Sequence, residues 1–322
     1  MFLSRAVAKA ALARGHEVVC AARGKSGAAP EGASLVTVDR DEPGALAPLR
    51  GERFDAVVDV ATMSLPWVRD ALAAVAATAA HWTFVSTINV YADTATTGQD
   101  TSAPLLAPLE AAGPATADVD PNAYGAIKVA SENAVRAAAG ERALIVRAGL
   151  ICGPGDVHDR FGYWAQRFAR GGRAVVPDVP DQPMQIVDVR DLAAWIVEAG
   201  EQRLAGTFDG SGPRSTLGAV LDEVAGAVGA ADLERVPVSP AALAAAEVNP
   251  WAGRRSLPLW LPESHWGFVA RDTAPAAAAG LRARPIGDTA RGALEHERAL
   301  GTDRARKAGL TPEDEAALLA LG

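Results

Sequence analysis

Short apolar segments alternate with helical patterns along the first half of this chain, and this alternation limits the fold more than any other feature. The segments with strand character are residues 17–22, 34–38, 54–60, 82–86 and 143–147. Helical spacing marks residues 2–12, 67–80 and 124–139. Strands that alternate with helices form a parallel sheet covered on both faces. We therefore expect an α/β fold with a Rossmann-like, doubly wound parallel sheet.

The second half of the chain has a looser pattern. Residues 186–191 lead into a helix that contains Trp195, and residues 207–210 form a short strand. Residues 238–285 are rich in proline and hold three tryptophans, which indicates an irregular lobe. The expected dinucleotide-binding domain spans residues 1–160, with residues 186–212 returning to it. The expected smaller substrate lobe contains residues 161–185 and 213–322.

Composition narrows the class of protein. The 322 residues are 49% hydrophobic and carry a net charge of −8, which suits a large core and argues against nucleic acid as a partner. No apolar run has the length that a membrane span needs. Cys20 and Cys152 lie far apart in apolar surroundings, so we expect buried thiols in a reducing, cytoplasmic compartment.

Tyr124 and Lys128 form the most informative polar pattern. Residues four apart share one face of a helix, so the Lys128 ammonium is expected beside the Tyr124 phenol, where it would lower the phenol's pKa. A hydroxyl from Thr87 or from Ser86, at the end of a strand, could then hold a substrate oxygen. The plainer alternatives are a packed tyrosine, an exposed lysine and a threonine that caps a loop.

Several motifs together resemble the extended and atypical short-chain dehydrogenase/reductases, the NAD-dependent epimerase/dehydratase group, and within it actinobacterial reductases. The motifs lie at residues 2–7, 86–91, 124–128, 146–155 and 186–193. The resemblance implies an NAD(P)-dependent oxidoreductase or epimerase that acts on a small hydroxyl or carbonyl substrate. It implies Tyr124 as the acid/base, Thr87 as the hydroxyl that holds the substrate, and Lys128 as a further ligand of the cofactor ribose.

The residues expected to bind the cofactor follow the strand ends. Arg23 stands where NAD enzymes place an acidic residue, and a guanidinium suits a 2′-phosphate, so NADP is expected over NAD. The resemblance implies that Asp39 and Arg40 contact the adenine and that Val60, Ala61 and Thr62 lie along the cofactor. It also implies that Leu150 and Ile151 flank the nicotinamide.

The sequence also departs from the family pattern. The family's first strand and its glycine-rich turn have no counterpart before residues 2–7 of this sequence. In the family that strand lies in the middle of the sheet, so the two strands on either side of it are expected to lack a hydrogen-bonding partner here. Three explanations are open: a natural start upstream of Met1, a shortened chain repaired by dimerisation or rearrangement, and a family member with weak or no cofactor binding. Ile88 and Asn89 replace the acidic pair of sugar dehydratases, which argues against dehydration.

Other functional interpretations stay open. A non-catalytic nucleotide-binding or regulatory protein could keep this fold, and a structural homodimer could complete its sheet from a second chain. Candidates to line a substrate pocket are Trp164, Gln185, Arg190 and Trp251, and the two tryptophans suit a core better than a ligand contact. His158 lies between two aspartates, but its turn lacks further ligands, so a metal site is not expected.

Overall fold

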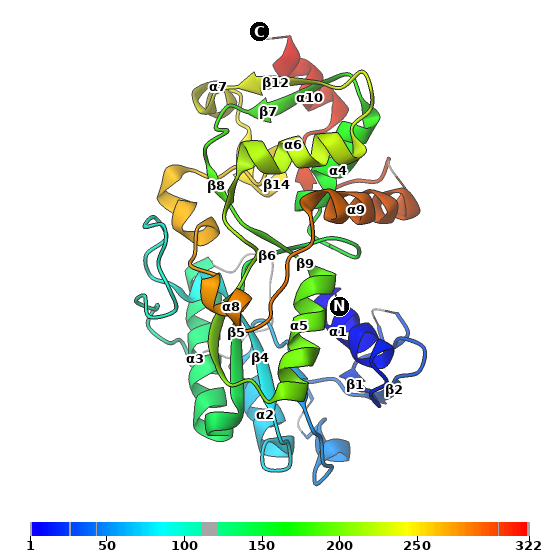
Figure 1. The fold of residues 1–322 in the computed structure, drawn as a ribbon, viewed down its shortest axis with the longest axis vertical. Coiled ribbons are helices and arrows are strands. Elements are labelled where there is room, and N and C mark those ends of the chain that lie inside the picture. Colours follow the sequence, from blue (N-terminus) through cyan, green and yellow to red (C-terminus); the bar gives the residue numbers. More distant parts are fainter. Residues whose placement is uncertain (1, 26, 43, 111–120, 302, 321–322) are drawn as a thin grey trace.

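A four-stranded parallel sheet forms the centre of the lower part of the molecule in the computed structural model (Figure 1). The model describes residues 2–25, 27–42, 44–110, 121–301 and 303–320. The strand order is β10-β5-β4-β3, with β3 at Val57–Asp59, β4 at Trp82–Thr87, β5 at Ala143–Ala148 and β10 at Gly206–Gly210. The predicted α/β class with a parallel sheet is confirmed.

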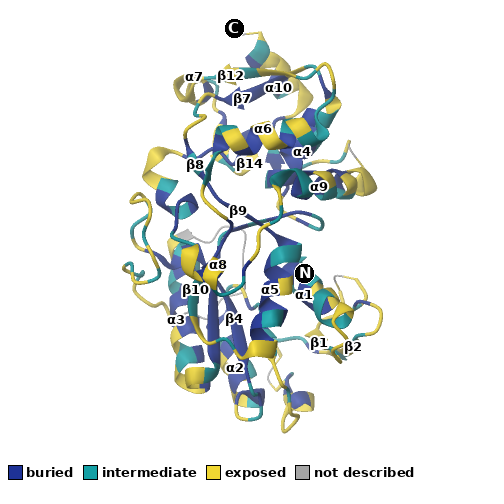
Figure 2. Cartoon of the chain, in the orientation of Figure 1, coloured by how far each residue is buried: buried dark blue, intermediate teal, exposed yellow. Residues whose placement is uncertain are grey.

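The register brings the carboxyl ends of β4 and β5 to one edge of the sheet. Trp82 pairs with Ala143 at the start, and Thr87 pairs with Ala148 at the end. Every residue of these two strands is buried (Figure 2). Continuous burial is typical of parallel strands covered on both faces. It agrees with the apolar character of β5, which has Arg147 as its one polar residue, whereas β4 also buries Thr83, Ser86 and Thr87.

Helices cover both faces of this sheet. On one face, α1 (Phe2–Ala13) packs against α5 (Val189–Gln202). Their apolar side chains share a core with strand residues such as Val146. On the other face, α2 (Leu65–Val75) packs against α3 (Pro121–Ala139), over a core that includes Phe84. The site residues of α3 are therefore held against the carboxyl edge of β4.

The sheet is interrupted where the family's first strand would lie. β1 (Val19–Ala22) and β2 (Ser34–Thr37) form a separate parallel pair, and within the described residues neither is bonded to β3. The prediction that the segment at residues 17–22 is a buried strand is wrong, because Val19 is 37% exposed and Cys20 is half-buried. An apolar strand is buried only when neighbouring strands and helices cover it.

A second group of elements lies above the sheet in Figure 1 and has its own apolar core. It contains α4 (Arg160–Arg170), β7 (Arg173–Pro177), α6 (Leu217–Val228), β12 (Glu234–Val238) and α9 (Ile286–Leu300). Trp164 is fully buried in this core, and its indole Nε1 donates to the Pro258 carbonyl at 2.8 Å. Trp164 is thus a core residue.

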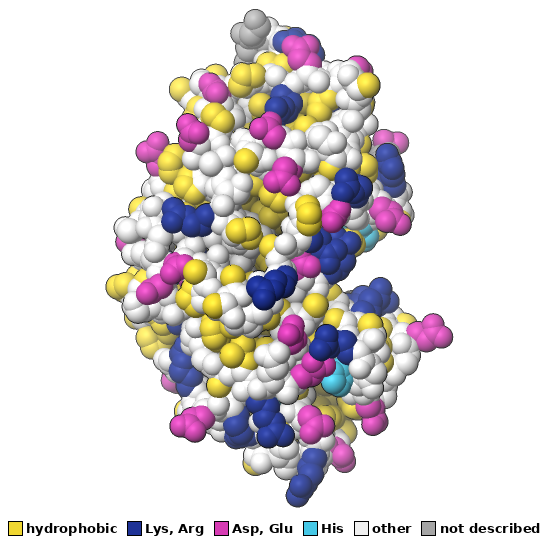
Figure 3. Space-filling model, viewed as in Figure 1, with side chains coloured by type: hydrophobic (Ala, Val, Ile, Leu, Met, Phe, Trp, Pro, Cys, Tyr) yellow, Lys and Arg dark blue, Asp and Glu magenta, His cyan; other side chains and the backbone are white. Residues whose placement is uncertain are grey.

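The remaining elements are short. They are β6 (Leu150–Cys152), β8 (Pro183–Met184), β9 (Ile186–Asp188), β11 (Ser215–Thr216), α7 (Pro240–Ala245), β13 (Asn249–Trp251), β14 (Gly253–Arg254), β15 (Ser256–Pro258), α8 (Ala274–Ala278), β16 (Ala308–Gly309), α10 (Pro312–Leu319) and the 3-10 helices η1 (Ala47–Leu49), η2 (Ile88–Val90), η3 (Gly140–Arg142) and η4 (Glu263–Val269). In Figure 3 the surface is indented between the part that carries α9 and the part that carries α1.

Some predicted boundaries differ from the structure for local reasons. The helix predicted at residues 67–80 is α2, which begins earlier because Ser64 caps it, its hydroxyl accepting from the Trp67 amide. The predicted strand at residues 54–60 shortens to β3. Asp188 caps α5, accepting from the Arg190 amide at 2.8 Å.

Candidate functional site

The end of β4 places two hydroxyl groups in different surroundings. Ser86 Oγ donates to the buried Glu132 carboxylate at 2.6 Å, and this carboxylate also pairs with Arg147 at 2.9 Å. Thr87 instead caps η2: its Oγ1 accepts from the Asn89 amide at 3.2 Å and donates to Asn89 Oδ1 at 3.1 Å. Neighbouring residues of a strand point to opposite faces. Ser86 is therefore part of a structural ion-pair network.

Gly125 lets α3 approach the turn that follows β4. A Cβ at this position would lie 2.0 Å from the Asn89 carbonyl oxygen, so no side chain can be accommodated. Tyr124 precedes this contact on α3, and its phenol is influenced by the Thr87 side chain. The glycine thus brings the phenol and the threonine hydroxyl together at the carboxyl edge of the sheet.

Burial raises the pKa of Tyr124 above its ordinary value, while the Thr87 side chain and the positive charge of Arg160 lower it. The sequence predicts the opposite net direction, with Lys128 as the cause, and that prediction is wrong for this structure. Lys128 is not among the groups that shift the pKa of Tyr124. The phenol is therefore protonated at neutral pH.

The Lys128 ammonium is directed to backbone carbonyl groups. Its Nζ donates to the Ala61 and Val85 oxygens, at 2.6 Å each, and lies 4.4 Å from the centre of the Phe84 ring. Burial lowers the pKa of Lys128 to about 8, against the raising effect of the Asp59 and Glu132 charges. Lys128 shares a helix face with Tyr124, but this does not determine the position of the ammonium at the end of its four-carbon side chain.

Asp59 connects several of the residues predicted to bind the cofactor. Its carboxylate accepts from Arg40 Nη1 at 3.0 Å and from the Ala61 amide at 2.9 Å. The Arg40 guanidinium also lies over the Trp67 ring, 5.6 Å from its centre. Arg40, Ala61 and Lys128 are thus joined through Asp59 and the Ala61 carbonyl at the end of β3.

Of the other predicted cofactor residues, Asp39, Val60 and Thr62 adjoin this group in sequence, whereas Arg23, Leu150 and Ile151 lie on or after other strands. Asp39 accepts from the Asp41 amide at 3.3 Å, and Arg23 is exposed after β1, with no ion pair to any described residue. Leu150 is buried and Ile151 is half-buried in β6. Val60 is half-buried and Thr62 exposed after β3. No described contact brings these six residues to Tyr124.

Arg160, the first residue of α4, is a polar neighbour of Tyr124 that the sequence analysis missed. Its guanidinium lies over the Trp251 ring, 5.0 Å from the ring centre. Arg160 and Trp251 are far apart in sequence, so no local sequence pattern connects them. The one available signal was their position: Arg160 follows the turn at residues 153–156, and Trp251 was a candidate pocket residue.

Two other sequence candidates, Gln185 and Arg190, have structural partners. The Gln185 amide donates to the Gly212 carbonyl at 3.1 Å and accepts from the Arg271 amide at 2.7 Å. Arg190 binds Asp188, with Nη2 to Oδ2 at 2.6 Å. The neighbouring Asp191 accepts at its Oδ1 from Arg284 Nη2 at 2.7 Å. These contacts are part of the fold and do not define a pocket.

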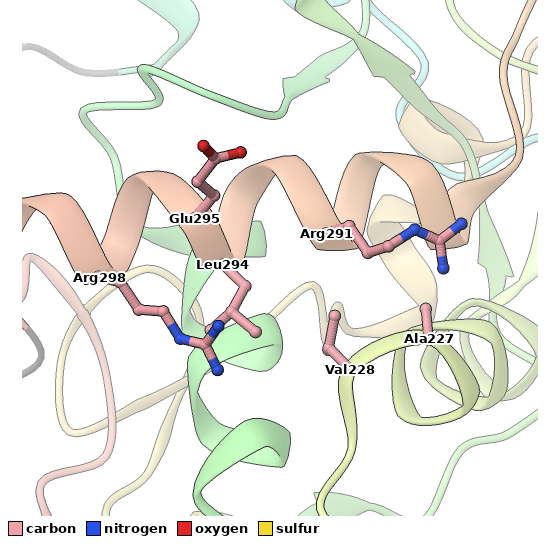
Figure 4. Close-up of a pocket in the computed structure, with 6 residues that line it drawn as sticks. All are labelled: Ala227, Val228, Arg291, Leu294, Glu295 and Arg298. Carbon is pink, nitrogen blue, oxygen red and sulfur yellow. The ribbon is translucent and has the colours of Figure 1, made fainter.

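A depression of about 480 Å³ lies elsewhere, between α6 and α9 (Figure 4). Arg291, Leu294, Glu295 and Arg298 of α9 line it, and none of the predicted site residues does. Within the described ranges, no group of three or more His, Cys, Asp and Glu residues could hold a metal ion. No helix in those ranges is long and apolar enough to cross a membrane.

Comparisons with known proteins give a family and a fold. A model of the NAD dependent epimerase/dehydratase family matches residues 2–208. A search of the curated proteins finds no match. A solved structure from Burkholderia cenocepacia J2315 shares 21% identity at a TM-score of 0.66, over 93% of this chain and 95% of that chain.

Two further solved structures carry different chemistry on the same fold. The UDP-glucose 4-epimerase of Thermus thermophilus, solved with NAD, has a TM-score of 0.62 at 19% identity, over 92% of this chain and 96% of that chain. TunA, an NAD dependent NDP-hexosamine 5,6-dehydratase of tunicamycin biosynthesis, has a TM-score of 0.66 at 17% identity, over 94% and 96%. At these identities the likeness is one of fold.

Proposed function

Because the chain belongs to the NAD dependent epimerase/dehydratase family, we propose that it is an NAD(P)-dependent oxidoreductase or epimerase of a small hydroxyl or carbonyl substrate. The observation that carries this proposal is the Tyr124 phenol beside the Thr87 hydroxyl at the carboxyl end of β4. Ligands of open parallel sheets bind outside the carboxyl ends of the strands. A tyrosine at that edge is placed to exchange a proton with a bound substrate.

The proposed roles follow from the surroundings of each group. The Thr87 hydroxyl holds the substrate oxygen, and the Tyr124 phenol donates a proton to it or accepts one from it. Burial keeps the phenol protonated at neutral pH, which suits proton donation to an oxygen that gains negative charge during reduction. In the oxidation direction, the phenol must lose its proton before it can accept one. When bound, the nicotinamide supplies the hydride acceptor or donor.

The described residues fit a nicotinamide dinucleotide at two places. An ammonium has three N–H donors, and Lys128 uses two on the Ala61 and Val85 carbonyls, which leaves the third for a ribose hydroxyl. Arg23 is exposed after β1 with no ion pair to a described residue, so its guanidinium is free for a 2′-phosphate. We therefore propose NADP as the preferred cofactor and NAD as the weaker one.

Arg23→Gln tests this cofactor preference. We expect the KM for NADPH to rise by roughly tenfold or more and the KM for NADH to stay the same, because the lost contact is to the 2′-phosphate alone. Equal changes for both cofactors would contradict the assignment.

We propose epimerisation or reduction in preference to dehydration. Water elimination needs an acid and a base beside the hydroxyl, and neither Ile88 nor Asn89 supplies one. Ile88 is buried, and the Asn89 side chain is hydrogen-bonded to Thr87. The proposed substrate is a small molecule and the proposed compartment is the cytoplasm, which the free thiols of Cys20 and Cys152 support.

Tyr124→Phe tests the proposed function, with Tyr163→Phe as the matched control in the core around α4. UDP-glucose and UDP-glucuronic acid are incubated with NAD⁺ or NADP⁺, and epimerised sugar and reduced cofactor are measured. We expect Tyr124→Phe to lose activity by about 10²–10⁴-fold while dinucleotide affinity is unchanged. Tyr163→Phe should keep activity. Full activity in Tyr124→Phe would overturn the proposal.

A second candidate is a nucleotide-binding protein without catalysis. It is favoured by the raised pKa of Tyr124 and by the Lys128 ammonium being held by two carbonyl groups. Such a protein would bind the dinucleotide without turnover, and its Tyr124→Phe variant would bind like the wild type. The assay above separates the two candidates, since only an enzyme has turnover to lose.

A further inference from the structure

Arg160 is a cation without an ion-pair partner among the described residues, at the edge of the proposed site. Its guanidinium lies over the Trp251 ring at 5.0 Å, and its Nε is buried with no hydrogen-bond partner in the described chain. A buried Nε in this state is costly, because this one N–H group has left water without gaining an acceptor.

Asp156 is the carboxyl group whose charge raises the pKa of Arg160, but no ion pair or hydrogen bond joins these two residues within the described ranges. Its Oδ1 accepts from the His158 amide at 2.9 Å, and its Oδ2 is buried without a partner in the described ranges. Burial raises the pKa of Asp156, which weakens its carboxylate as a counter-ion. The Arg160 guanidinium therefore keeps hydrogen-bonding capacity that no described side chain uses.

Trp251 is held in place by an unusual backbone. Its φ is +68°, and Glu247, Arg255 and Leu259 of the same segment also have positive φ. Strained residues of this kind cluster at ligand-binding sites. The strained segment fixes the indole over one face of the Arg160 guanidinium. Stacking on that face leaves the planar N–H edge for a ligand.

Arg160 also lies within electrostatic reach of the proposed acid/base. Its charge lowers the pKa of Tyr124, and the Tyr124 phenol in turn raises the pKa of Arg160. A substrate oxygen held at Tyr124 and Thr87 would thus lie near the guanidinium. An anionic group only a few bonds from that oxygen could reach Arg160.

We propose that Arg160, stacked on Trp251, is the receptor for a carboxylate that the substrate carries close to its reacting hydroxyl or carbonyl group. This inference rests on the proposed function and adds the substrate class: a hydroxy acid such as a uronic acid unit. The fork of N–H groups on a guanidinium matches a carboxylate in two parallel hydrogen bonds. Arg160 is thereby a residue that determines specificity.

UDP-glucuronic acid and UDP-glucose are a matched pair of probes, since they differ at one carbon, which carries a carboxylate or a hydroxymethyl group. Their affinities are measured by calorimetry in the presence of NADP⁺, on the wild type, Arg160→Gln, Arg160→Lys and Arg298→Gln. Arg298 is exposed on α9 beside the depression in Figure 4 and controls for the loss of one charge. Thermal unfolding checks that each variant is folded.

We expect the wild type and Arg298→Gln to bind UDP-glucuronic acid about 10- to 100-fold more tightly than UDP-glucose. Arg160→Gln should bind the two within about twofold, and Arg160→Lys should keep part of the preference because it keeps the charge. Equal affinities in the wild type, no binding of either sugar, or a preference that survives in Arg160→Gln would overturn the inference.

The outcome is independent of the test of the proposed function. A preference that depends on Arg160 without any turnover would contradict the catalytic proposal and leave the carboxylate receptor in place. Turnover that depends on Tyr124 without a preference for the carboxylate would do the reverse.

Discussion

Lys128 gives a prediction whose size follows from the structure. Its side chain is 2% exposed, and burial lowers its pKa from 10.5 to about 8. Between these two pH values the unfolded chain binds a proton at this position and the folded chain does not. Stability must therefore rise with pH across this window. Each pH unit corresponds to about 1.4 kcal/mol, so the full rise is about 3 kcal/mol.

Lys128→Met isolates this contribution, because all other titrating groups are shared with the wild type. Urea unfolding of both proteins at several values between pH 7 and pH 10.5 gives the difference in unfolding free energy at each pH. We expect the wild type to gain about 3 kcal/mol relative to the variant over this range. Lys9→Met, at an exposed position of α1, controls for the loss of one positive charge and should show a small change with pH.

A difference that stays flat from pH 7 to pH 10.5 would refute the reasoning. It would mean that the Lys128 ammonium is in contact with water, and that its hydrogen bonds to Ala61 and Val85 do not describe the folded protein. A difference that falls with pH would mean that a negative group stabilises the charged form more than burial opposes it.

Two further predictions concern the packing around the site. Gly125→Ala should lower the free energy of unfolding in urea by at least about 2 kcal/mol, because its Cβ would lie 2.0 Å from the Asn89 carbonyl oxygen. The control, Gly226→Ala in α6, places its Cβ in open space and should raise the free energy of unfolding by about 0.5–1 kcal/mol. Equal effects of the two substitutions would contradict the close contact of α3 with the turn after β4. In hydrogen-exchange mass spectrometry, amides of β1 and β2 should exchange faster than those of β4 and β5, because the first pair of strands is largely exposed and the second is fully buried. Equal exchange rates would contradict the separation of β1 and β2 from the four-stranded sheet.

The elements of the fold were predictable where burial is decided locally. The apolar segments that became β4 and β5 lie in the middle of the four-stranded sheet, so sequence character and environment agree. The segment that became β1 has the same character but is mostly exposed. Its environment depends on a neighbouring strand, and the composition of a segment does not report its neighbours.

The candidate site was predictable in part. The motif around Tyr124 placed the phenol near the end of β4, where Ser86 donates to Glu132 and Thr87 acts on the phenol. The direction of the Lys128 ammonium was not predictable, because a long side chain selects among acceptors that the fold brings together. The pairing of Arg160 with Trp251 depends on the path of residues 247–259, which no periodic pattern describes.

The pKa of the Tyr124 phenol with and without dinucleotide tests the central claim most directly. The chain has three tyrosines, so ¹³C-tyrosine NMR gives few signals, and Tyr124→Phe identifies the one that matters. We expect a pKa above 10.0 in the free protein, and a fall of about one unit or more when NAD⁺ or NADP⁺ saturates it, because the nicotinamide ring is positively charged. A pKa that saturating dinucleotide leaves unchanged would contradict a tyrosine that faces the nicotinamide.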